Sequence, residues 1–277
     1  MDPASLLSAA IIGIVEGITE FLPISSTAHI RLAELATGFH DKGQTFAVVI
    51  QLGAILAVVA YFWRRLTALV VGVLGRDPAS LRFLGGLTIA ALPPAVIGLL
   101  LNKWLEVHVF GAYELAIIAA TMAVGGLAIL AIERWRPQPR YTDSATLPPR
   151  TCLWIGLMQV LAMIPGVSRS GASIMGAMCI GVERKAATEF SFFLAIPIML
   201  GASCLKLAKH HDHVHGAFAE AIAVGFIVSF VVALGVVHWL MKYVASHTFR
   251  PFAWYRLAAG LVIAVLLVAG LIPMAVH

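Results

Sequence analysis

The sequence predicts an all-α membrane protein, a single polytopic helical bundle, and two properties of the chain carry this prediction. Of its 277 residues, 60% are hydrophobic and only 12% are charged. Water-soluble domains carry about 25% charged residues, so a soluble fold is excluded. The hydrophobic residues also gather in long segments, and a helix needs about 20 of them to cross the hydrocarbon core of a bilayer.

Six segments are long and apolar enough to be full membrane spans. They are residues 45–63, 83–101, 113–132, 188–207, 218–241 and 252–273. Tryptophan and tyrosine residues stand near several of their ends, as is typical of segments that end at a membrane–water interface. We therefore expect six spanning helices.

Four further apolar segments predict two re-entrant helical hairpins. Segments 4–22 and 26–39 flank the polar stretch FLPISST, and segments 152–164 and 171–182 flank IPGVSRS. The last three of these segments are too short to span a membrane, whereas 4–22 is nearly long enough to do so. Irregular backbone at membrane depth is tolerated only where it lines a cavity or is buried in protein. We expect each polar stretch to form the tip of a hairpin.

The basic residues predict the orientation of the chain. The loops expected on one side of the membrane are rich in arginine: 64–82, 133–150, 183–187 and 242–256. The loops expected on the other side hold only four basic residues: Lys42, Lys103, Lys206 and Lys209. Cytoplasmic loops carry an excess of Lys and Arg, so this count places the first set in the cytoplasm and both termini outside.

The chain also contains a weak internal repeat. At an offset of 143 residues, Ser25 aligns with Ser168 and Glu16 aligns with Gln159. Three predicted spans separate the two broken segments, and because three is odd, the units should be inverted relative to each other. We predict one domain over residues 1–277, made of repeat unit one at about 1–132, a cytoplasmic linker at about 133–150 and repeat unit two at about 151–277. Inverted repeats are frequent in transporters, so transport is an alternative function.

Two carboxylates in the first broken segment predict a cation site. Glu16 and Glu20 are four residues apart, so they share one face of a helix. Paired carboxylates in low dielectric repel each other unless they share a proton or hold a cation. Oxygen ligands suit a divalent cation such as Mg²⁺ or Ca²⁺. The alternative is two separate carboxyl groups that hydrogen-bond to other helices.

A run of hydroxyl residues and a histidine follow the two carboxylates. Ser25, Ser26 and Thr27 are residue types preferred at a helix N-cap, and a helix N-terminus binds phosphate through its free N–H groups and its dipole. For any one of these hydroxyls, plain capping is the alternative. His29 follows Ser26 by about one helical turn, so it is expected to activate that hydroxyl or a water. A histidine that only packs in the core is the alternative.

The second broken segment is predicted to cradle phosphate. Gly166 permits a close approach of the backbone, and Ser168 and Ser170 are expected to cap the following helix and contact phosphate. The guanidinium of Arg169 matches the geometry of phosphate oxygens. Its alternative partner is one of the two glutamates, and both contacts could occur in turn, with the ion pair in the empty site.

These motifs resemble those of a known family. EGITEFLPISSTAH (16–29) and PGVSRSGAS (165–173) are similar to the two signature motifs of the undecaprenyl-diphosphate phosphatases of the bacitracin-resistance type. FAVVIQLGAILAVV (46–59) and EFSFFLAIP (189–197) also resemble that family, and the resemblance spans nearly the whole chain. One departure is Ala28, where many members have glycine, and its methyl group touches none of the predicted chemistry.

The resemblance implies a function and assigns site residues. It implies hydrolysis of undecaprenyl diphosphate to undecaprenyl phosphate, which recycles the lipid carrier for peptidoglycan synthesis and confers bacitracin resistance. It also implies a divalent cation and an active site that opens to the outer face of the bacterial cytoplasmic membrane. The family's acidic pair maps onto Glu16 and Glu20, its serine onto Ser26, its histidine onto His29 and its arginine onto Arg169.

The predicted mechanism starts from these residues. Ser26 attacks the terminal phosphorus or positions the attacking water, His29 acts as general acid–base, and Arg169 with the cation neutralises the developing charge. A lipid-phosphate flippase or ion-coupled transporter is the main alternative, and a purely structural scaffold is a third. The expected partners are the lipid substrate and membrane lipid, with no nucleic acid, and a homodimer is left open.

Overall fold

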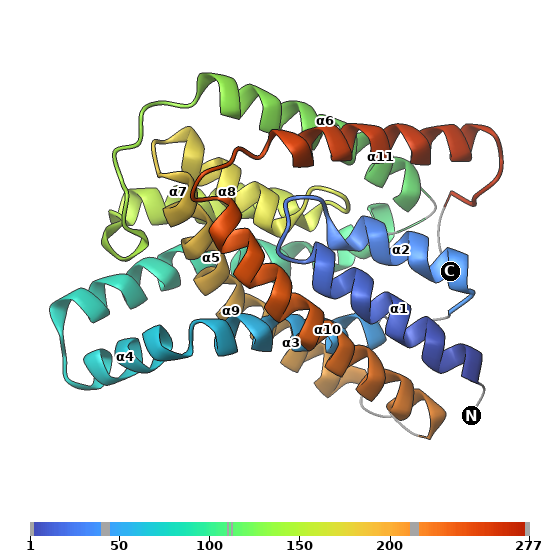
Figure 1. Ribbon diagram of the computed structural model, residues 1–277, viewed down its shortest axis with the longest axis horizontal. Coiled ribbons are helices and arrows are strands. Elements are labelled where there is room, and N and C mark those ends of the chain that lie inside the picture. Colours follow the sequence, from blue (N-terminus) through green and yellow to red (C-terminus); the bar gives the residue numbers. More distant parts are fainter. Residues whose placement is uncertain (1–2, 40–44, 110, 112, 211–215, 275–277) are drawn as a thin grey trace.

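A computed structural model describes residues 3–39, 45–109, 111, 113–210 and 216–274, and the regular structure in these ranges is helical (Figure 1). The predicted all-α class is confirmed. The α-helices are α1 (Pro3–Thr19), α2 (Ser26–Thr37), α3 (Thr45–Tyr61), α4 (Trp63–Leu74), α5 (Pro78–His108), α6 (Glu114–Trp135), α7 (Pro149–Val160), α8 (Arg169–Cys179), α9 (Arg184–His210), α10 (Ala217–Tyr243) and α11 (Arg250–Val268).

Five helices are long and apolar enough to cross a membrane: Pro78–Leu101 within α5, α6, Arg184–Cys204 within α9, Phe218–Tyr243 within α10, and α11. They match five of the six predicted spans. The sixth predicted span, 45–63, corresponds to α3, which passes the same test only together with α4. These two helices are bent by 76° relative to each other. The chain is therefore a multi-pass membrane protein with five or six candidate spans.

Helix α4 corrects the prediction that residues 64–82 form a loop. Most of this stretch is helical, because α4 runs to Leu74 and α5 begins at Pro78. Two consecutive arginines, Arg64 and Arg65, are costly inside hydrocarbon, which favours a bend just before them. None of the α4 residues is buried, so α4 lies on the outside of the bundle.

The two predicted broken segments are present as pairs of short helices. A break at residues 20–25 separates α1 from α2, and a break at residues 161–168 separates α7 from α8. Within each pair, the two short helices pack against each other. We call the two breaks tip one (20–25) and tip two (161–168).

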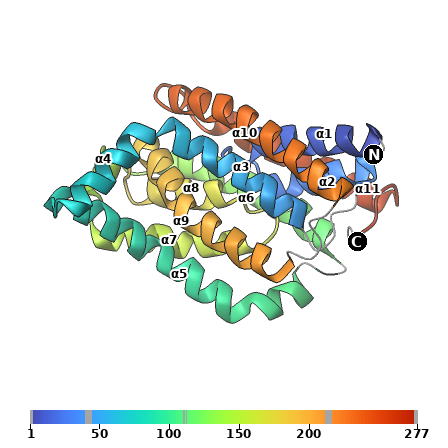
Figure 2. The ribbon, with the colours of Figure 1, turned by 90° about the horizontal axis from the view of Figure 1, so that it is seen from below.

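The longer helices pack against these pairs and against one another. Helix α1 packs against α10, and α7 packs against α5, while α3 packs against α9 and α6 against α11. Figure 2 shows α1 and α10 along one edge of the molecule and α5 and α7 along the opposite edge, with α3, α8 and α9 between them. This arrangement brings the two tips together in the interior.

Aromatic side chains anchor tip one in the core. The ring of Phe21 meets that of Phe192 on α9 edge-on, with centroids 5.1 Å apart, and both side chains are fully buried. Phe62 and Phe83 pack against Phe193, one residue further along α9, at 5.0 and 5.3 Å. Aromatic pairs of this kind stabilise a core beyond the area they bury, so the backbone of tip one is held against α9.

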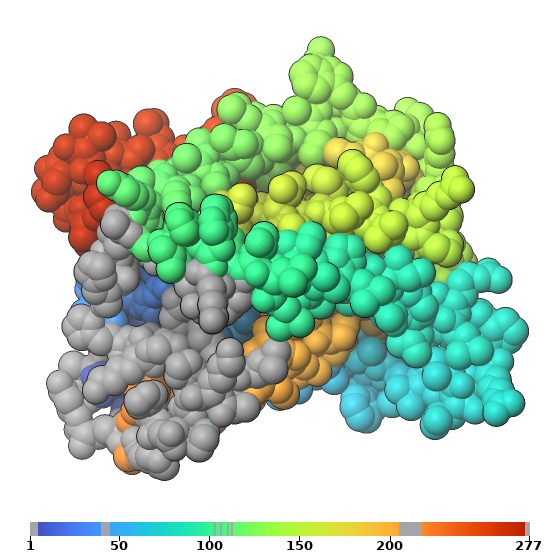
Figure 3. All heavy atoms as spheres, turned by 180° about the vertical axis from the view of Figure 1, so that it is seen from behind, coloured from blue at the N-terminus to red at the C-terminus, as the bar shows by residue number. Residues whose placement is uncertain are grey.

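The outer surface is apolar, as expected for a protein in lipid. Helices α5, α6 and α7 cover much of the face in Figure 3. Large hydrophobic side chains of these helices are exposed: Leu92, Val96, Leu99, Leu100, Val124, Leu127 and Leu157. Many exposed large hydrophobic side chains on one protein mark contact with a membrane.

The arginine-rich loops lie together at one end of the bundle, at the ends of α6 and α10 and the starts of α7, α9 and α11 (Figure 1). The start of α1 and the end of α11 lie at the other end. Of the four lysines predicted there, Lys42 lies outside the described residues, as do the side chains of Lys103, Lys206 and Lys209.

Candidate active site

A hydrogen bond joins tip one to the start of α8, directly after tip two. The hydroxyl of Ser170, in the first turn of α8, donates to the carbonyl oxygen of Leu22 in tip one at 2.9 Å. Ser170 is fully buried. In this structure the predicted phosphate ligand Ser170 therefore joins the start of α8 to tip one.

Each tip ends at a serine that caps the next helix. Ser25 and Ser168 have φ angles of 72° and 76°, which are uncommon for residues other than glycine. The Ser25 hydroxyl accepts a hydrogen bond from the N–H of Ala28 at 3.5 Å, and the Ser168 hydroxyl accepts one from Gly171 at 3.1 Å. Both serines satisfy N–H groups that would otherwise lack a partner. Capping, which the sequence allowed for these residues, is what the structure shows.

Glu20 is the centre of the polar cluster at tip one. The hydroxyl of Ser26 donates to Oε2 of Glu20 at 2.5 Å. Nη2 of Arg169, at the start of α8, donates to Oε1 of Glu20 at 3.4 Å. The carboxyl group of Glu20 is buried, at 5% relative exposure of the residue. The carboxylate of Glu20 thus contacts the Ser26 hydroxyl on one oxygen and the Arg169 guanidinium on the other, which is the ion-pair alternative for Arg169.

Glu16 lies deeper than Glu20 and has spare hydrogen-bonding capacity. It is 1% exposed, and its Oε1 has no hydrogen-bond partner among the described residues. It lies close enough to Glu20 and Arg169 to interact with both electrostatically. Arg169 donates from Nη1 to the carbonyl of Ser191 at 3.2 Å, while its Nε is also unpartnered among the described residues. Polar atoms left without a partner at a buried site require an explanation such as an ion or ligand.

Among the described hydrogen bonds, His29 is paired with neither Glu20 nor Ser26. Its Nδ1 lies 2.7 Å from the carbonyl oxygen of Ser25, and its Nε2 lies 2.6 Å from the hydroxyl of Tyr255 on α11. The direct His29–Ser26 pair expected from the sequence is therefore absent from the described contacts. One turn of spacing places two side chains on the same face of a helix, but the rotamers decide which neighbours they reach.

Thr27 and Gly166 are the two other predicted phosphate ligands. Thr27 is half-buried in the first turn of α2. Gly166 has a φ angle of 86°, a conformation that glycine adopts without steric cost. A Cβ atom at this position would collide with the side chain of Thr121 and the backbone of Ile118 on α6. Tip two can therefore approach α6 only because residue 166 is glycine.

Arg256 was missed as a site residue, and its predicted position in a cytoplasmic loop is wrong. It lies inside α11, is 1% exposed, and uses its guanidinium to hold both tips. It donates hydrogen bonds to the backbone carbonyl oxygens of Pro23 (3.1 Å), Val167 (3.1 Å), Gly166 (2.9 Å), Thr121 (3.0 Å) and Met122 (3.4 Å). The predicted span 252–273 already contained this arginine, and a charge inside an apolar span was the signal that could have revealed it.

The predicted metal pair has only two carboxylates. Among the described residues, no group of three or more His, Cys, Asp or Glu side chains is arranged to hold a metal ion. Glu16 and Glu20 would therefore need oxygen ligands from substrate, water or backbone to complete the coordination of a divalent cation, which Mg²⁺ commonly obtains in that way.

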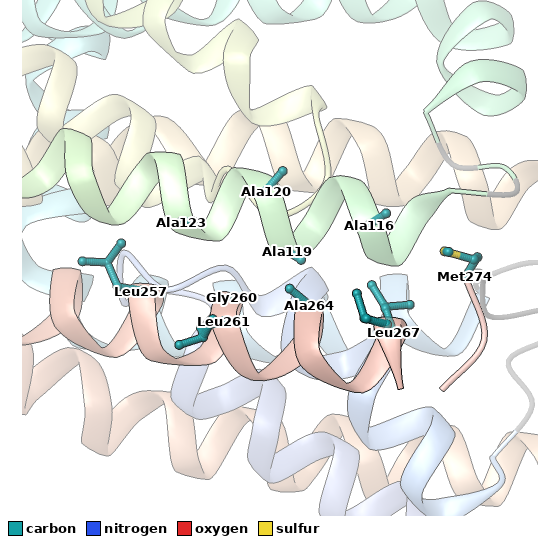
Figure 4. Close-up of a pocket in the computed structure, with 11 residues that line it drawn as sticks. Ala116, Ala119, Ala120, Ala123, Leu257, Gly260, Leu261, Ala264, Leu267 and Met274 are labelled. Carbon is teal, nitrogen blue, oxygen red and sulfur yellow. The ribbon is translucent and has the colours of Figure 1, made fainter. Parts of the chain in front are cut away.

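An apolar groove of about 670 Å³ runs between α6 and α11 (Figure 4). It is lined by small residues such as Ala119, Ala123 and Gly260 and by the larger side chains of Leu261 and Leu267. No predicted catalytic residue lines it. The groove and the polar cluster are therefore separate features.

Comparison with known proteins decides the family. A family model described as bacitracin resistance protein BacA matches residues 9–262. The chain belongs to this family. The matched range contains both tips and every residue of the polar cluster, so the family predicted from the two motifs is confirmed.

Relatives in the BacA family are similar over nearly their whole length. The undecaprenyl-diphosphatase of Novosphingobium aromaticivorans is 48% identical over 263 residues, covering 93% of this chain and 96% of the relative. Undecaprenyl-diphosphatase 2 of Rhodospirillum rubrum is 48% identical over 274 residues, covering 98% of each. The undecaprenyl-diphosphatase of Cereibacter sphaeroides is 44% identical over 271 residues, covering 98% of this chain and 100% of the relative.

Proposed function

We propose that this BacA-family protein hydrolyses undecaprenyl diphosphate to undecaprenyl phosphate and inorganic phosphate, and thereby recycles a lipid carrier for peptidoglycan synthesis and confers bacitracin resistance. Relatives named undecaprenyl-diphosphatase, which are 44–48% identical to this chain, support the reaction. The observation that carries the proposal is the contact between Ser26 and Glu20 at 2.5 Å, with Arg169 on the other carboxylate oxygen. A hydroxyl paired with a buried carboxylate is the arrangement of an activated nucleophile.

In the proposed first step, Oγ of Ser26 attacks the terminal phosphorus while its proton passes to Oε2 of Glu20. The bond from that phosphorus to the bridging oxygen breaks, and the lipid monophosphate leaves. Water then attacks the phosphoserine, inorganic phosphate departs, and Ser26 regains a proton. In the alternative mechanism Ser26 only positions a water that attacks directly. Trapping a phosphoserine at residue 26 distinguishes the two.

Arg169 and the helix N-termini are proposed to bind the diphosphate. Helices α2 and α8 both begin where the tips meet, so their free N–H groups and dipoles point toward the same place. The Arg169–Glu20 contact is long, at 3.4 Å, and Nε of Arg169 is unpartnered among the described residues. The guanidinium therefore has donors to offer an incoming phosphate, where it would stabilise the transferring phosphoryl group.

The site also suits a divalent cation, which we propose as a cofactor. The buried Oε1 of Glu16 has no hydrogen-bond partner within the described part of the chain, and a carboxylate donor set fits Mg²⁺ or Ca²⁺. Glu16 and Glu20 would hold the ion. When bound, it would neutralise charge on the diphosphate oxygens.

We further propose that the chain is an inverted repeat with re-entrant hairpins. Two observations support this arrangement. The aligned residues Ser25 and Ser168 cap their helices with nearly the same φ. The packing of α1 against α10 is matched by that of α7 against α5, as expected if unit one and unit two exchange places.

The arginine-rich end of the bundle supports an orientation with that end in the cytoplasm and both termini outside. Tip one is then reached from the outer face, because α1 and α2 extend from the tip to the end of the molecule that carries the termini (Figure 1). We therefore propose that the active site opens to the outer face of the bacterial cytoplasmic membrane, where membrane lipid and the lipid substrate are its partners.

Phosphate release from undecaprenyl diphosphate by the purified protein, with and without chelator, tests this function. Ser26→Ala and Glu20→Gln should abolish turnover, whereas the exposed Ser246→Ala and Glu220→Gln serve as matched controls and should retain it. Lipid binding without phosphate release by the folded wild type would instead favour the transporter, for which the inverted arrangement is equally suited.

A further inference from the structure

Tyr255 makes a contact that the proposed mechanism does not use. Its hydroxyl lies 2.6 Å from Nε2 of His29, although the two residues are 226 positions apart in the chain. The two rings are also stacked, with centroids 5.5 Å apart and planes 12° from parallel. A tyrosine near the start of an apolar span is usually an anchor at the membrane interface, and an anchor needs neither of these contacts.

The hydrogen bond at Nδ1 of His29 fixes which atom donates in each of the two hydrogen bonds of the ring. Nδ1 lies 2.7 Å from the carbonyl oxygen of Ser25, which can only accept, so Nδ1 carries the hydrogen. In a neutral imidazole Nε2 is then unprotonated and has a lone pair. Tyr255 is therefore the donor to Nε2, and Nε2 is the basic atom of the ring.

The position of Tyr255 is itself tied to the tips. The next residue, Arg256, donates hydrogen bonds to the carbonyls of Pro23 and Val167 at 3.1 Å. Helix α11 is therefore bound to Pro23, which lies two residues before Ser25 in tip one. The carbonyl of Ser25 orients the other side of the His29 ring. The imidazole is therefore hydrogen-bonded to tip one on one side and to α11 on the other.

We propose that Tyr255 is a positioning residue for His29. It holds the imidazole in the neutral form protonated on Nδ1, with Nε2 accepting from the Tyr255 hydroxyl, and Nε2 takes up a proton only when that hydroxyl turns away from it. This role rests on the acid–base function that the sequence predicts for His29, beside the transfer of the Ser26 proton to Glu20 in the proposed function. It involves no contact between Tyr255 and the substrate, so its effect must pass through His29.

A double-mutant cycle on the full-length protein tests this role. Phosphate release from undecaprenyl diphosphate is measured for wild type, Tyr255→Phe, His29→Ala and the double variant. Tyr255→Phe keeps the ring but removes the hydroxyl, and should lower kcat by about tenfold, since small losses of alignment are costly in catalysis. KM should stay within about twofold of the wild-type value, because the hydroxyl does not bind substrate. In the His29→Ala background the same change should have less than about a twofold effect.

Tyr243→Phe is the matched control. Its hydroxyl donates to the carbonyl of Thr248 at 3.1 Å, at the end of α10 that carries the arginine-rich loops. It should leave kcat unchanged. The size-exclusion elution profile and the thermal unfolding of every variant report whether its fold is intact.

A spectroscopic measurement gives a readout besides activity. The chain has ten histidines, and His29→Ala identifies the ¹⁵N signals of residue 29. The wild type should show a protonated Nδ1 and an unprotonated Nε2. Tyr255→Phe should shift the Nε2 signal, and Tyr243→Phe should not.

The outcomes separate this inference from the proposed function. An unchanged kcat in Tyr255→Phe, or an equal loss in the His29→Ala background, would overturn the positioning role and leave the function standing. Full activity of His29→Ala would overturn the acid–base role of His29 and the positioning role of Tyr255 together. An Nε2 signal that is protonated in the wild type would overturn the tautomer on which the inference depends.

Discussion

Nη1 of Arg256 donates a 3.1 Å hydrogen bond to the carbonyl oxygen of Pro23, 233 residues earlier in the chain. The same nitrogen reaches the carbonyl of Val167 at 3.1 Å. One buried guanidinium therefore satisfies backbone acceptors from both tips at once. Backbone carbonyls at membrane depth need such partners, and here a single side chain provides them where no helix or strand can.

We expect Arg256→Lys to be strongly destabilising although it keeps the positive charge. A guanidinium is a rigid planar fork with five N–H donors, whereas an ammonium has three on a compact centre. Lysine therefore leaves several carbonyls of the tips without a donor, and each unsatisfied buried group costs about 1–3 kcal/mol. Thermal unfolding in detergent measures the loss. Arg250→Lys, at the exposed start of α11, is the control, and equal unfolding temperatures for the two variants would contradict the prediction.

Gly166→Ala should displace tip two. The added methyl group meets Thr121 and Ile118, and alanine is strained at a φ of 86°. We expect phosphate release to fall by more than about tenfold, because an ångström of misplacement near a reacting group has effects of that size or larger. Gly235→Ala on α10 is the control. A Cβ there meets nothing within 4 Å, and alanine favours a helix, so stability should stay level or rise slightly. Normal activity of Gly166→Ala would show that tip two tolerates movement.

A helix cap outside the membrane spans predicts a pH effect on stability. Asp77 precedes α5 and accepts hydrogen bonds from the hydroxyl and N–H of Ser80 at 2.7 and 2.8 Å. These bonds lower the pKa of Asp77, the hydroxyl bond most. Because the folded-state pKa lies below the unfolded one, the contribution of Asp77 is present above the unfolded value and is lost as pH falls through the folded value.

Asp77→Asn should keep much of the cap, since asparagine is also a favoured N-cap residue, but should remove this part of the pH dependence. Thermal unfolding of wild type and variant between neutral and acidic pH measures the difference. The two unfolding temperatures should converge as pH falls, and a constant gap at all pH values would contradict the assignment.

The local part of this architecture could be predicted from the sequence. Proline with adjacent hydroxyl residues interrupts an apolar run and caps a new helix, so the breaks and the caps at Ser25 and Ser168 follow from neighbouring residues alone. The pairing of Ser26 with Glu20 could not, because it depends on rotamers at a tip whose backbone is set by distant helices. The roles of Arg256 and Tyr255 depend on where α11 crosses both tips, which no local pattern encodes. The 76° bend between α3 and α4 is hidden for a simpler reason: a charged boundary at the end of an apolar segment predicts the start of a loop as readily as a bend.

Glu16→Gln tests the proposed cation directly. Gln159, the residue aligned with Glu16 in the second unit, also has a buried Oε1 without a partner among the described residues, so an amide is compatible with this kind of position in the fold. The change removes one negative charge from the pair with Glu20. It should weaken the binding of a divalent cation much more than it disturbs packing. After treatment with chelator, the Mg²⁺ or Ca²⁺ concentration that restores half of the activity should rise by at least about tenfold, as expected when a carboxylate ligand is lost. Glu220→Gln on the exposed surface of α10 should leave that concentration unchanged. Wild-type activity that survives the chelator in full would mean that Glu16 serves the reaction through its charge or its proton, and would remove the cation from the mechanism.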